Sequence, residues 1–330
     1  MKRVSPTIGV AVRYDLQAAP HARTFFRTLA LARNEYPRIA ALRFVFADDL
    51  GTREGALRAA EHFERAGARI VIGHMSSDAA QAAVSRYAQS GTLLLLPTAT
   101  ASALTTNGSP VLRLCAPDCV LAGRLVAHLA SHGWRRLRIA CEPTRHGQQL
   151  AADITDAASL HGIAVLNDGD DASPGTCSVF VGGVQASADY VLKRRDAGCT
   201  EPIFLTDDAA SASLAERIGD AGHVSIVGFA PAYALARGEV LARSYVRWYA
   251  ENPGVNALET FAALHIAAQL AAESSIDPQR IGDMSFDTPT ARVRFSARQN
   301  RDTAHAIWSL KSGRLMLEQV IEAGASNESI

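Results

Sequence analysis

Two stretches of sequence decide the fold: Ala68-Arg-Ile-Val-Ile-Gly-His-Met-Ser-Ser-Asp78 and Leu93-Leu-Leu-Leu-Pro-Thr-Ala-Thr100. In each stretch, a short apolar run that suits a buried strand ends in small hydroxyl-bearing residues. Ligands of open parallel sheets bind at the carboxyl ends of the strands, where a following helix adds unpaired backbone N–H groups. The two stretches together therefore predict a binding pocket for an anionic or strongly polar group.

Composition limits the classes of function that the chain can have. The 330 residues are 48% hydrophobic, and 33 Lys and Arg balance 33 Asp and Glu to give a formal net charge of zero. Two domains of ordinary size are expected at this length. A neutral chain offers no basic field for nucleic acid, and its apolar runs are far shorter than the roughly 20 residues that cross a bilayer. We expect a globular protein with small-molecule or protein partners, no nucleic acid, and no membrane-embedded part.

The chain alternates short aliphatic runs with longer alanine-rich stretches, a pattern typical of β-α-β units and of a parallel sheet. The expected strands are Thr7–Val12, Leu42–Ala47, Ile70–Gly73, Leu93–Leu96, Arg136–Cys141, Ser178–Gly182, Ile203–Leu205 and Val224–Gly228. The expected helices between them are His21–Asn34, Thr52–Ala66, Ser77–Gln89, Val120–Ser131, Gly147–Leu160, Ala186–Ala197 and Ala209–Gly219.

The pattern changes in the C-terminal third of the chain. Two consecutive helices are predicted there, Arg237–Glu251 and Ala257–Ala272. A short β meander is predicted after them, over Thr290–Phe295, His305–Leu310 and Arg314–Gln319.

Two extended segments mark points where the chain passes between domains. Val111-Leu-Arg-Leu-Cys-Ala-Pro-Asp118 ends in proline and an aspartate that is placed to cap the next helix. Val227-Gly-Phe-Ala-Pro231 has the same character, so the chain is expected to return its later helices to the first domain.

Motifs of catalysis and metal binding are absent from the sequence. It contains no glycine-rich phosphate loop, no G-x-S-x-G elbow and no His-Glu pair at helical spacing. The neighbours Asp48-Asp49 and Asp207-Asp208 would point to opposite faces of an extended segment, so neither pair suits two-carboxylate catalysis. We expect a protein that is not an enzyme and that has no cofactor.

The cysteines show no spacing of a zinc site or a redox motif. We expect no metal site, and we expect all of them to be ordinary buried or half-buried thiols. They are Cys115, Cys119, Cys141, Cys177 and Cys199.

Several motifs in the right order resemble a known family, the type I periplasmic binding proteins, over roughly residues 7 to 320. The residues that resemble the first lobe of the leucine/isoleucine/valine-binding group are Phe46-Ala-Asp-Asp49, Ile70–Ser77, Leu96–Thr100 with Leu104-Thr105, Arg113 and Asp118. The second lobe is similar to Arg138–Gly147, Phe180–Gly183 and Phe204–Asp208. The tail of the amide- and urea-binding branch is similar to Phe286–Pro289, Arg292–Phe295 and Asn300–His305.

The resemblance implies an α/β fold with two Rossmann-like, doubly wound parallel-sheet lobes, joined by a hinge of three crossovers. The first lobe would comprise residues 1–117 and 231–304, and the second lobe residues 118–230 and 305–330. In this family the two lobes close around an amino-acid-like or amide ligand by a hinge motion.

The resemblance also implies the ligand-binding residues. Ser77 and Thr100 would bind the carboxylate of the ligand with their hydroxyls and nearby amides, and Ala99 would present its backbone. Asp208 would face the ammonium of the ligand, because a buried ion needs a partner of opposite charge.

Several positions depart from the family pattern and bear on which ligand is bound. His146 stands where a tyrosine commonly covers the ligand, and Val184 stands at another aromatic position. Asp78 would favour the helix dipole but would repel a ligand carboxylate. Arg13 or Tyr14, in the altered first loop, could supply a compensating contact.

Each of these residues also has a purely structural interpretation. Ser77 could be a plain helix N-cap, and Thr100 a turn residue. His74 is better explained as a strand-end histidine that the backbone satisfies than as a ligand contact. His146 could be a solvated loop histidine, and Asp207 with Asp208 could simply begin a helix.

Two functions remain open at this point. In the first, the protein is the substrate-binding component of an ABC-type importer, and a membrane permease recognises the closed form. In the second, it is a cytoplasmic ligand sensor that regulates a partner protein. The sequence shows no signal peptide, and Gly51 and Ser76 occupy the positions of the family's disulfide, which predicts a cytoplasmic location. A start codon further upstream would instead place the protein in the periplasm.

Overall fold

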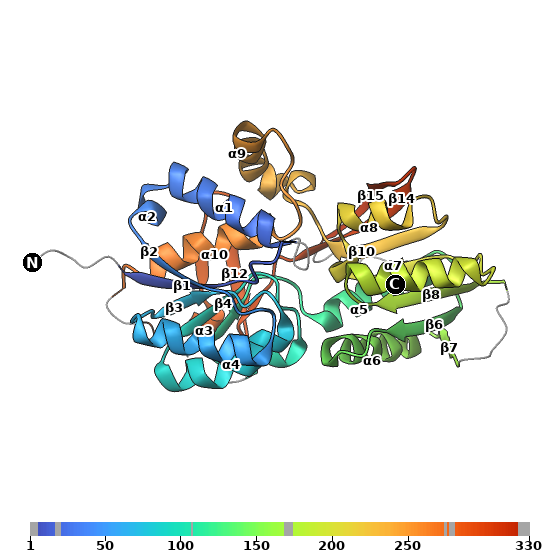
Figure 1. Ribbon diagram of the computed structural model, residues 1–330, viewed down its shortest axis with the longest axis horizontal. Coiled ribbons are helices and arrows are strands. Elements are labelled where there is room, and N and C mark those ends of the chain that lie inside the picture. The colour runs from blue at the N-terminus through green and yellow to red at the C-terminus, as the bar shows by residue number, and fades with distance from the viewer. Residues whose placement is uncertain are drawn as a thin grey trace, which may run out of the picture. The chain divides into compact units, whose positions relative to one another are not determined.

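The computed structural model divides the chain into two compact units. It describes residues 6–16, 21–106, 108–167, 174–273, 276 and 281–322. Unit 1 comprises Met1–Ala116 and Pro231–Thr303, and unit 2 comprises Pro117–Ala230 and Ala304–Ile330 (Figure 1). The chain thus passes between the units at 116–117, at 230–231 and at 303–304.

In the described part of unit 1, eight strands form one sheet in the order β11-β12-β13-β5-β4-β3-β1-β2. Along this order, each pair of neighbours from β13 through β5, β4, β3 and β1 to β2 is parallel. Strand β12 pairs antiparallel with both β11 and β13. Their bounds are β1 Thr7–Ala11, β2 Arg43–Ala47, β3 Ile70–Ile72, β4 Leu93–Leu96, β5 Val111–Arg113, β11 Ser285–Asp287, β12 Arg292–Ser296 and β13 Gln299–Asn300.

Helices cover both faces of this sheet, as in a doubly wound fold (Figure 1). The helices α1, α2 and α10 contact one another on one face, and α3 packs against α4 on the other. Their bounds are α1 His21–Glu35, α2 Pro37–Ala40, α3 Arg53–Arg65, α4 Ser77–Ser90, α9 Glu239–Tyr249 and α10 Ala257–Leu270. Short 3₁₀ helices span Ser102–Thr105, Ala232–Ala234, Ala236–Gly238 and Ile281–Asp283.

Unit 2 repeats the same architecture. Its described strands form a seven-stranded sheet in the order β15-β14-β10-β9-β8-β6-β7, in which only the pairings of β14 are antiparallel. The strands are β6 Arg136–Cys141, β7 Ala164–Leu166, β8 Thr176–Val181, β9 Ile203–Leu205, β10 Val224–Phe229, β14 Ala304–Lys311 and β15 Arg314–Glu322. The helices are α5 Asp118–Ser131, α6 Arg145–Leu160, α7 Val184–Asp196 and α8 Ala212–Ile218, with a 3₁₀ helix at Asp207–Ala209. The pair α5 and α6 and the pair α7 and α8 each pack together.

Burial on both faces explains why the central strands are continuous apolar runs. Every residue of β3 and β4 is buried, as expected for parallel strands that helices cover on each side. The core of unit 1 places these strands against alanines of α3 and α4, and small side chains let helix and sheet approach closely. Helix α10 is apolar around most of its circumference because nearly all its side chains are buried.

A glycine makes the close approach after β3 possible. Gly73 has a φ of +109°, and a Cβ atom there would lie 2.0 Å from the carbonyl oxygen of Ala11. Any other residue would clash with the neighbouring strand β1. The loop that carries Met75 and Ser76 to the start of α4 therefore depends on this glycine.

The predicted alternation of strands and helices is confirmed, but the predicted C-terminal meander is wrong. Strand β12 lies in the sheet of unit 1, between β11 and β13, whereas β14 and β15 form a hairpin on the edge of the unit 2 sheet. The strands are separated because the chain crosses between the units at 303–304. In the described part of the chain, every helix is too short or too polar to span a bilayer.

The prediction that Asp118 caps a helix is also wrong. Pro117 is the N-cap residue of α5, and Asp118 is the first residue inside the helix. Its carboxylate makes no capping hydrogen bond and faces another side chain, as described below.

Candidate functional site

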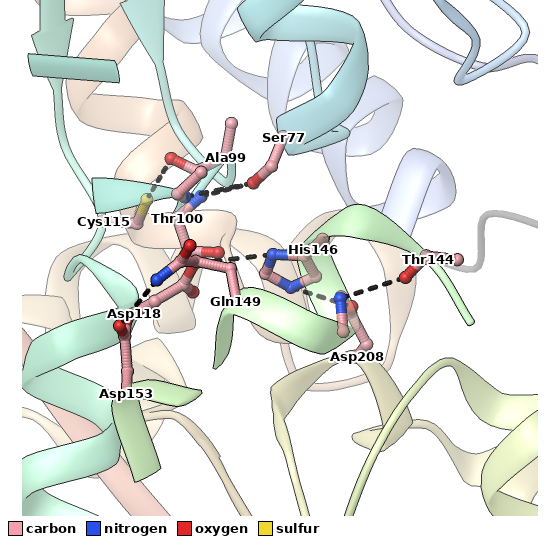
Figure 2. A network of polar contacts seen from close by, with 12 residues as sticks. Ser77, Ala99, Thr100, Cys115, Asp118, Thr144, His146, Gln149, Asp153 and Asp208 are labelled. Atoms are coloured by element: carbon pink, nitrogen blue, oxygen red, sulfur yellow. Dashed lines mark hydrogen bonds and ion pairs between the residues drawn. The ribbon is translucent and has the colours of Figure 1, made fainter. Parts of the chain in front are cut away.

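In unit 1, two loops at the carboxyl edge of the sheet are joined through Ser77. Ser77 begins α4, and its Oγ accepts hydrogen bonds from the backbone N–H groups of Thr100 and Ala101, both at 3.1 Å (Figure 2). The loop after β3 and the loop after β4 are also joined by the Thr98 hydroxyl, which donates to the Met75 carbonyl at 2.9 Å. Both loops come from adjacent parallel strands, so their polar residues meet at one edge.

Ala99 and Thr100 lie in the second of these loops, where the resemblance placed them. The Cys115 thiol donates to the Ala99 carbonyl at 3.5 Å. Thr100 is buried, and its amide already donates to Ser77, so in this structure that amide is used within the protein. The structure thus brings together Ser77, Ala99 and Thr100 in unit 1.

A buried arginine underlies the same loop. Arg113 is 2% exposed, and its guanidinium donates to the carbonyls of Thr100 at 2.9 Å and Ala101 at 2.6 Å. It also donates to the Thr105 hydroxyl at 3.1 Å and to the Gln299 side chain at 2.5 Å. The sequence comparison named Arg113 within a motif but assigned it no role.

His74 is satisfied by side chains rather than by the backbone, which corrects the prediction made for it. Its Nδ1 lies 2.7 Å from Asp49 Oδ2, and its Nε2 lies 2.9 Å from the Tyr87 hydroxyl. The three side chains are almost completely buried. Burial, together with the charge of Asp49, raises the pKa of the Tyr87 phenol. This network is a structural support for the edge of the sheet.

Just after β1, Arg13 is half-buried and Tyr14 is exposed. Arg13 forms an ion pair with Asp15 at 3.5 Å, and the backbone N–H of Tyr14 donates weakly to Asp48 at 3.4 Å. The Tyr14 ring packs edge-on against Phe26. Their predicted contact with a ligand stays a prediction, and residues 17–20 of this loop lie outside the described residues.

In unit 2, His146 lies between two aspartates. It belongs to the first turn of α6, its Nδ1 is 3.4 Å from Asp118 Oδ2, and its Nε2 is 3.5 Å from Asp208 Oδ2 (Figure 2). Burial alone would lower the pKa of His146, but the two carboxylates outweigh burial and raise it to about 12. At neutral pH the ring is therefore an imidazolium, and His146 is not the solvated loop histidine that the alternative interpretation described.

The adjacent aspartates differ sharply in environment. Asp207 is 5% exposed, whereas the side chain of Asp208 is 45% exposed. Burial, reinforced by the charges of Asp208 and Asp118, raises the pKa of Asp207 well above its usual range. Asp208 is thus the acid that solvent and a ligand can reach, while Asp207 is its buried neighbour.

The carboxylate of Asp118 is fully buried, and within the described residues neither of its oxygens accepts a hydrogen bond. Among the ion pairs of the described residues, His146 is the only cationic partner of Asp118. The acidic character of this edge therefore exceeds what the sequence predicted, because Asp118 was interpreted as a cap and Asp207 as a helix start. The sequence signals were the family motifs that contain both residues, and the position of Asp118 near a crossover and of Asp207 shortly after β9.

Val184 is the first residue of α7 and is half-buried. It follows Gly183, whose backbone N–H donates to the Glu142 carboxylate at 3.3 Å. The edge of unit 2 thus has an aliphatic side chain and a further carboxylate where the family pattern has an aromatic ring.

The five cysteines differ in burial, and one of them departs from the prediction made for the thiols. All five are free in the described part of the chain, and Cys119 is exposed, which contradicts the prediction that each would be buried or half-buried. Cys119 lies in the first turn of α5, directly after the buried Asp118. The described residues contain no cluster of histidine, cysteine and acidic side chains that could hold a metal ion.

Comparison with known proteins identifies the fold. No family model matches the chain. The leucine-, isoleucine-, valine-, threonine- and alanine-binding protein of Pseudomonas aeruginosa is 21% identical over 281 residues, which are 78% of this chain and 75% of that protein.

Solved structures agree over nearly the whole chain. An ABC transporter substrate-binding protein from Desulfitobacterium hafniense in complex with leucine has a TM-score of 0.78 and 23% identity, and the match covers 96% of this chain and 100% of that one. A leucine-binding protein from Thermotoga maritima has a TM-score of 0.83 and 16% identity, with 96% and 98% covered. The protein has the type I periplasmic binding protein fold, as the resemblance predicted.

Proposed function

We propose that the protein binds an amino acid, with the ligand carboxylate on the Ser77 edge of unit 1 and the ligand ammonium on the Asp208 edge of unit 2. The observation that carries this proposal is the opposite chemistry of the two edges. Unit 1 presents a hydroxyl whose acceptor capacity the protein already uses, and unit 2 presents an exposed carboxylate. An α-amino acid has the complementary groups, and a relative and a structural neighbour are named for amino acids or hold leucine.

We further propose that the protein is the substrate-binding component of an ABC-type importer, with a permease as its partner. The structural neighbour from Desulfitobacterium hafniense, which is named as an ABC transporter substrate-binding protein, supports this role over that of a sensor. A hinge between the units would convert ligand binding into a closed form that the permease recognises. The importer role predicts that the natural gene product is exported.

A thermal-shift panel tests the ligand class. The purified chain is heated with L-leucine, L-isoleucine, L-valine, L-threonine or L-alanine, and in parallel with acetamide and urea. A ligand at 100 times its Kd adds about 2.7 kcal/mol to the free energy of unfolding, which raises Tm measurably. We expect at least one amino acid to raise Tm. A rise with acetamide or urea alone would replace the amino acid by an amide, and no rise with any amino acid would refute the proposal.

Cell fractionation tests the role in transport. The natural gene is expressed with its own upstream sequence, and the protein is located by immunoblotting of periplasmic and cytoplasmic fractions. We expect it in the periplasm. A purely cytoplasmic protein would refute the importer role and favour the sensor of the alternative hypothesis.

A further inference from the structure

The guanidinium of Arg113 is connected to the hydroxyl of Ser77 through a single peptide group. Arg113 Nη1 donates to the carbonyl oxygen of Thr100 at 2.9 Å, and the N–H of Ala101 donates to Ser77 Oγ at 3.1 Å. That carbonyl and that N–H belong to the same peptide unit, between Thr100 and Ala101. The path from the arginine to the serine is therefore a continuous chain of hydrogen bonds.

A continuous series of hydrogen bonds polarises each of the groups that it connects. A guanidinium keeps its positive charge at every pH at which proteins are folded. Hydrogen bonded to a carbonyl oxygen, it draws electron density from the peptide and makes the N–H of that peptide a stronger donor, and successive hydrogen bonds in one chain strengthen one another. The Ser77 oxygen, which receives this N–H, becomes poorer in electron density, so its own O–H becomes a stronger donor.

Ser77 has only its proton left to offer a ligand. A hydroxyl carries one donor and two acceptor lone pairs. Both acceptor positions are used by the N–H groups of Thr100 and Ala101, and the described residues include no acceptor for the Ser77 proton. A ligand group that meets Ser77 must therefore accept a hydrogen bond, and an anionic acceptor gains most.

We propose that Arg113 is a positioning residue that acts through the Thr100–Ala101 peptide to make Ser77 a strengthened donor, and that it thereby selects a ligand carboxylate over a neutral amide. The inference rests on the proposed function, because it assigns the chemistry of the ligand at the unit 1 edge. It goes beyond that function, because Arg113 itself is 2% exposed and acts through Ser77 rather than by contact.

Gln299 offers a way to offset the positive charge of Arg113 without removing the arginine side chain. The Gln299 Oε1 accepts from Arg113 Nε at 2.5 Å, and its Nε2 donates to the Cys115 carbonyl at 2.6 Å. A Gln299→Glu variant keeps the first hydrogen bond and places a carboxylate directly against the guanidinium. Asn300→Asp is the matched control, because it adds the same charge one residue away, at a side chain that donates to Leu114 instead.

The test compares each amino acid of the thermal-shift panel with its own amide. Isothermal titration gives the affinities of L-leucine, L-isoleucine, L-valine, L-threonine and L-alanine, and of the corresponding amino acid amides, at a pH where all the amines are protonated. The quantity of interest is the ratio of acid to amide affinity in wild type, Arg113→Gln, Arg113→Lys, Gln299→Glu and Asn300→Asp.

We expect Arg113→Gln and Gln299→Glu to lower this ratio by about tenfold, the size of one charge-assisted hydrogen bond. Arg113→Lys, which keeps the charge, should retain more of the ratio, and Asn300→Asp should leave it near the wild-type value. In a Ser77→Ala background, Arg113→Gln should no longer change the ratio, because the hydroxyl through which Arg113 acts on the ligand is then missing.

The outcomes separate the inference from the proposed function. Equal losses of affinity for acid and amide, or an effect of Arg113→Gln that persists without Ser77, would show that Arg113 is merely structural, while amino acid binding would stand. If Arg113→Gln fails to fold, Gln299→Glu decides the question by the same ratio. If no amino acid binds to the wild type, the proposed function and the inference are both wrong.

Discussion

The Nε2 atom of His146 lies 3.5 Å from Oδ2 of Asp208, so the acid that the resemblance assigns to the ligand ammonium already faces a cation of the protein (Figure 2). The same ring lies 3.4 Å from the buried Asp118. The imidazolium ring therefore lies between two carboxylates of unit 2. The side chain of Asp208 is 45% exposed, so a ligand ammonium can still approach it.

Asp208→Asn should weaken amino acid binding without unfolding the protein. The variant loses a charge-assisted hydrogen bond, so we expect affinity to fall by about tenfold or more in isothermal titration. Asp196→Asn, at the exposed end of α7, is the control and should bind as the wild type does. An unchanged affinity in Asp208→Asn would remove this residue from the site.

His146→Gln should destabilise the protein in a pH-dependent way. The pKa of His146 is raised from 6.5 to about 12, so the ion pairs contribute fully below pH 6.5 and are lost as pH rises toward 12. Because the variant leaves Asp118 buried without its cation, we expect a loss of roughly 3 kcal/mol near pH 6.5 in urea unfolding, and a smaller loss at pH 10. His161→Gln, at the exposed end of α6, is the control, and a loss in His146→Gln that did not vary with pH would contradict this account.

Glu259→Gln should stabilise the protein above neutral pH. Glu259 lines a small cavity in unit 1 with Arg237 and Leu258, and its Oε2 is buried without a hydrogen bond from any described residue. Burial raises the pKa of Glu259 from 4.5 to about 7, although its own backbone N–H and the charge of Arg237 oppose the rise.

The sign of the effect follows from proton binding. Between pH 4.5 and 7 the folded protein holds a proton on Glu259 that the unfolded chain has lost, so stability falls as pH rises through this window. The full shift corresponds to about 3 kcal/mol. We expect Glu259→Gln to gain up to that amount at pH 8 and little at pH 4.5, as measured by chemical unfolding. The exposed Glu239→Gln is the control, and an equal gain at both pH values would contradict burial as the cause.

Tyr87→Phe should destabilise unit 1 by about 1 to 3 kcal/mol, because it leaves a ring nitrogen of His74 buried and unpaired. The half-exposed Tyr233→Phe is the control. Urea unfolding of both variants measures the difference. Equal stabilities would show that a water molecule replaces the hydroxyl and that the Asp49–His74–Tyr87 network contributes little.

The strands and helices that carry the site were predictable because local pattern determines them. Short continuous apolar runs bounded by turn residues, such as Leu93–Leu96, favour strands covered on both faces, and the polar residues after such parallel strands meet at the carboxyl edge. The order of β12 and β14 was not predictable in this way. Both have the composition of an antiparallel strand, and only the crossover between the units assigns them to different sheets.

The sequence by itself determined the alternation of strands and helices, and the strand ends near which Ser77 and Thr100 of unit 1 and Asp208 of unit 2 lie, because periodicity and strand ends are local properties. The type I fold was implied by a resemblance of motifs and not by this alternation. Only the tertiary structure decided the partners of the charges. Asp118 and His146 are 28 positions apart in the sequence, and Arg113 reaches Gln299 across 186 positions. Long-range pairs of this kind depend on how strands and helices pack, and no local pattern of residues encodes them.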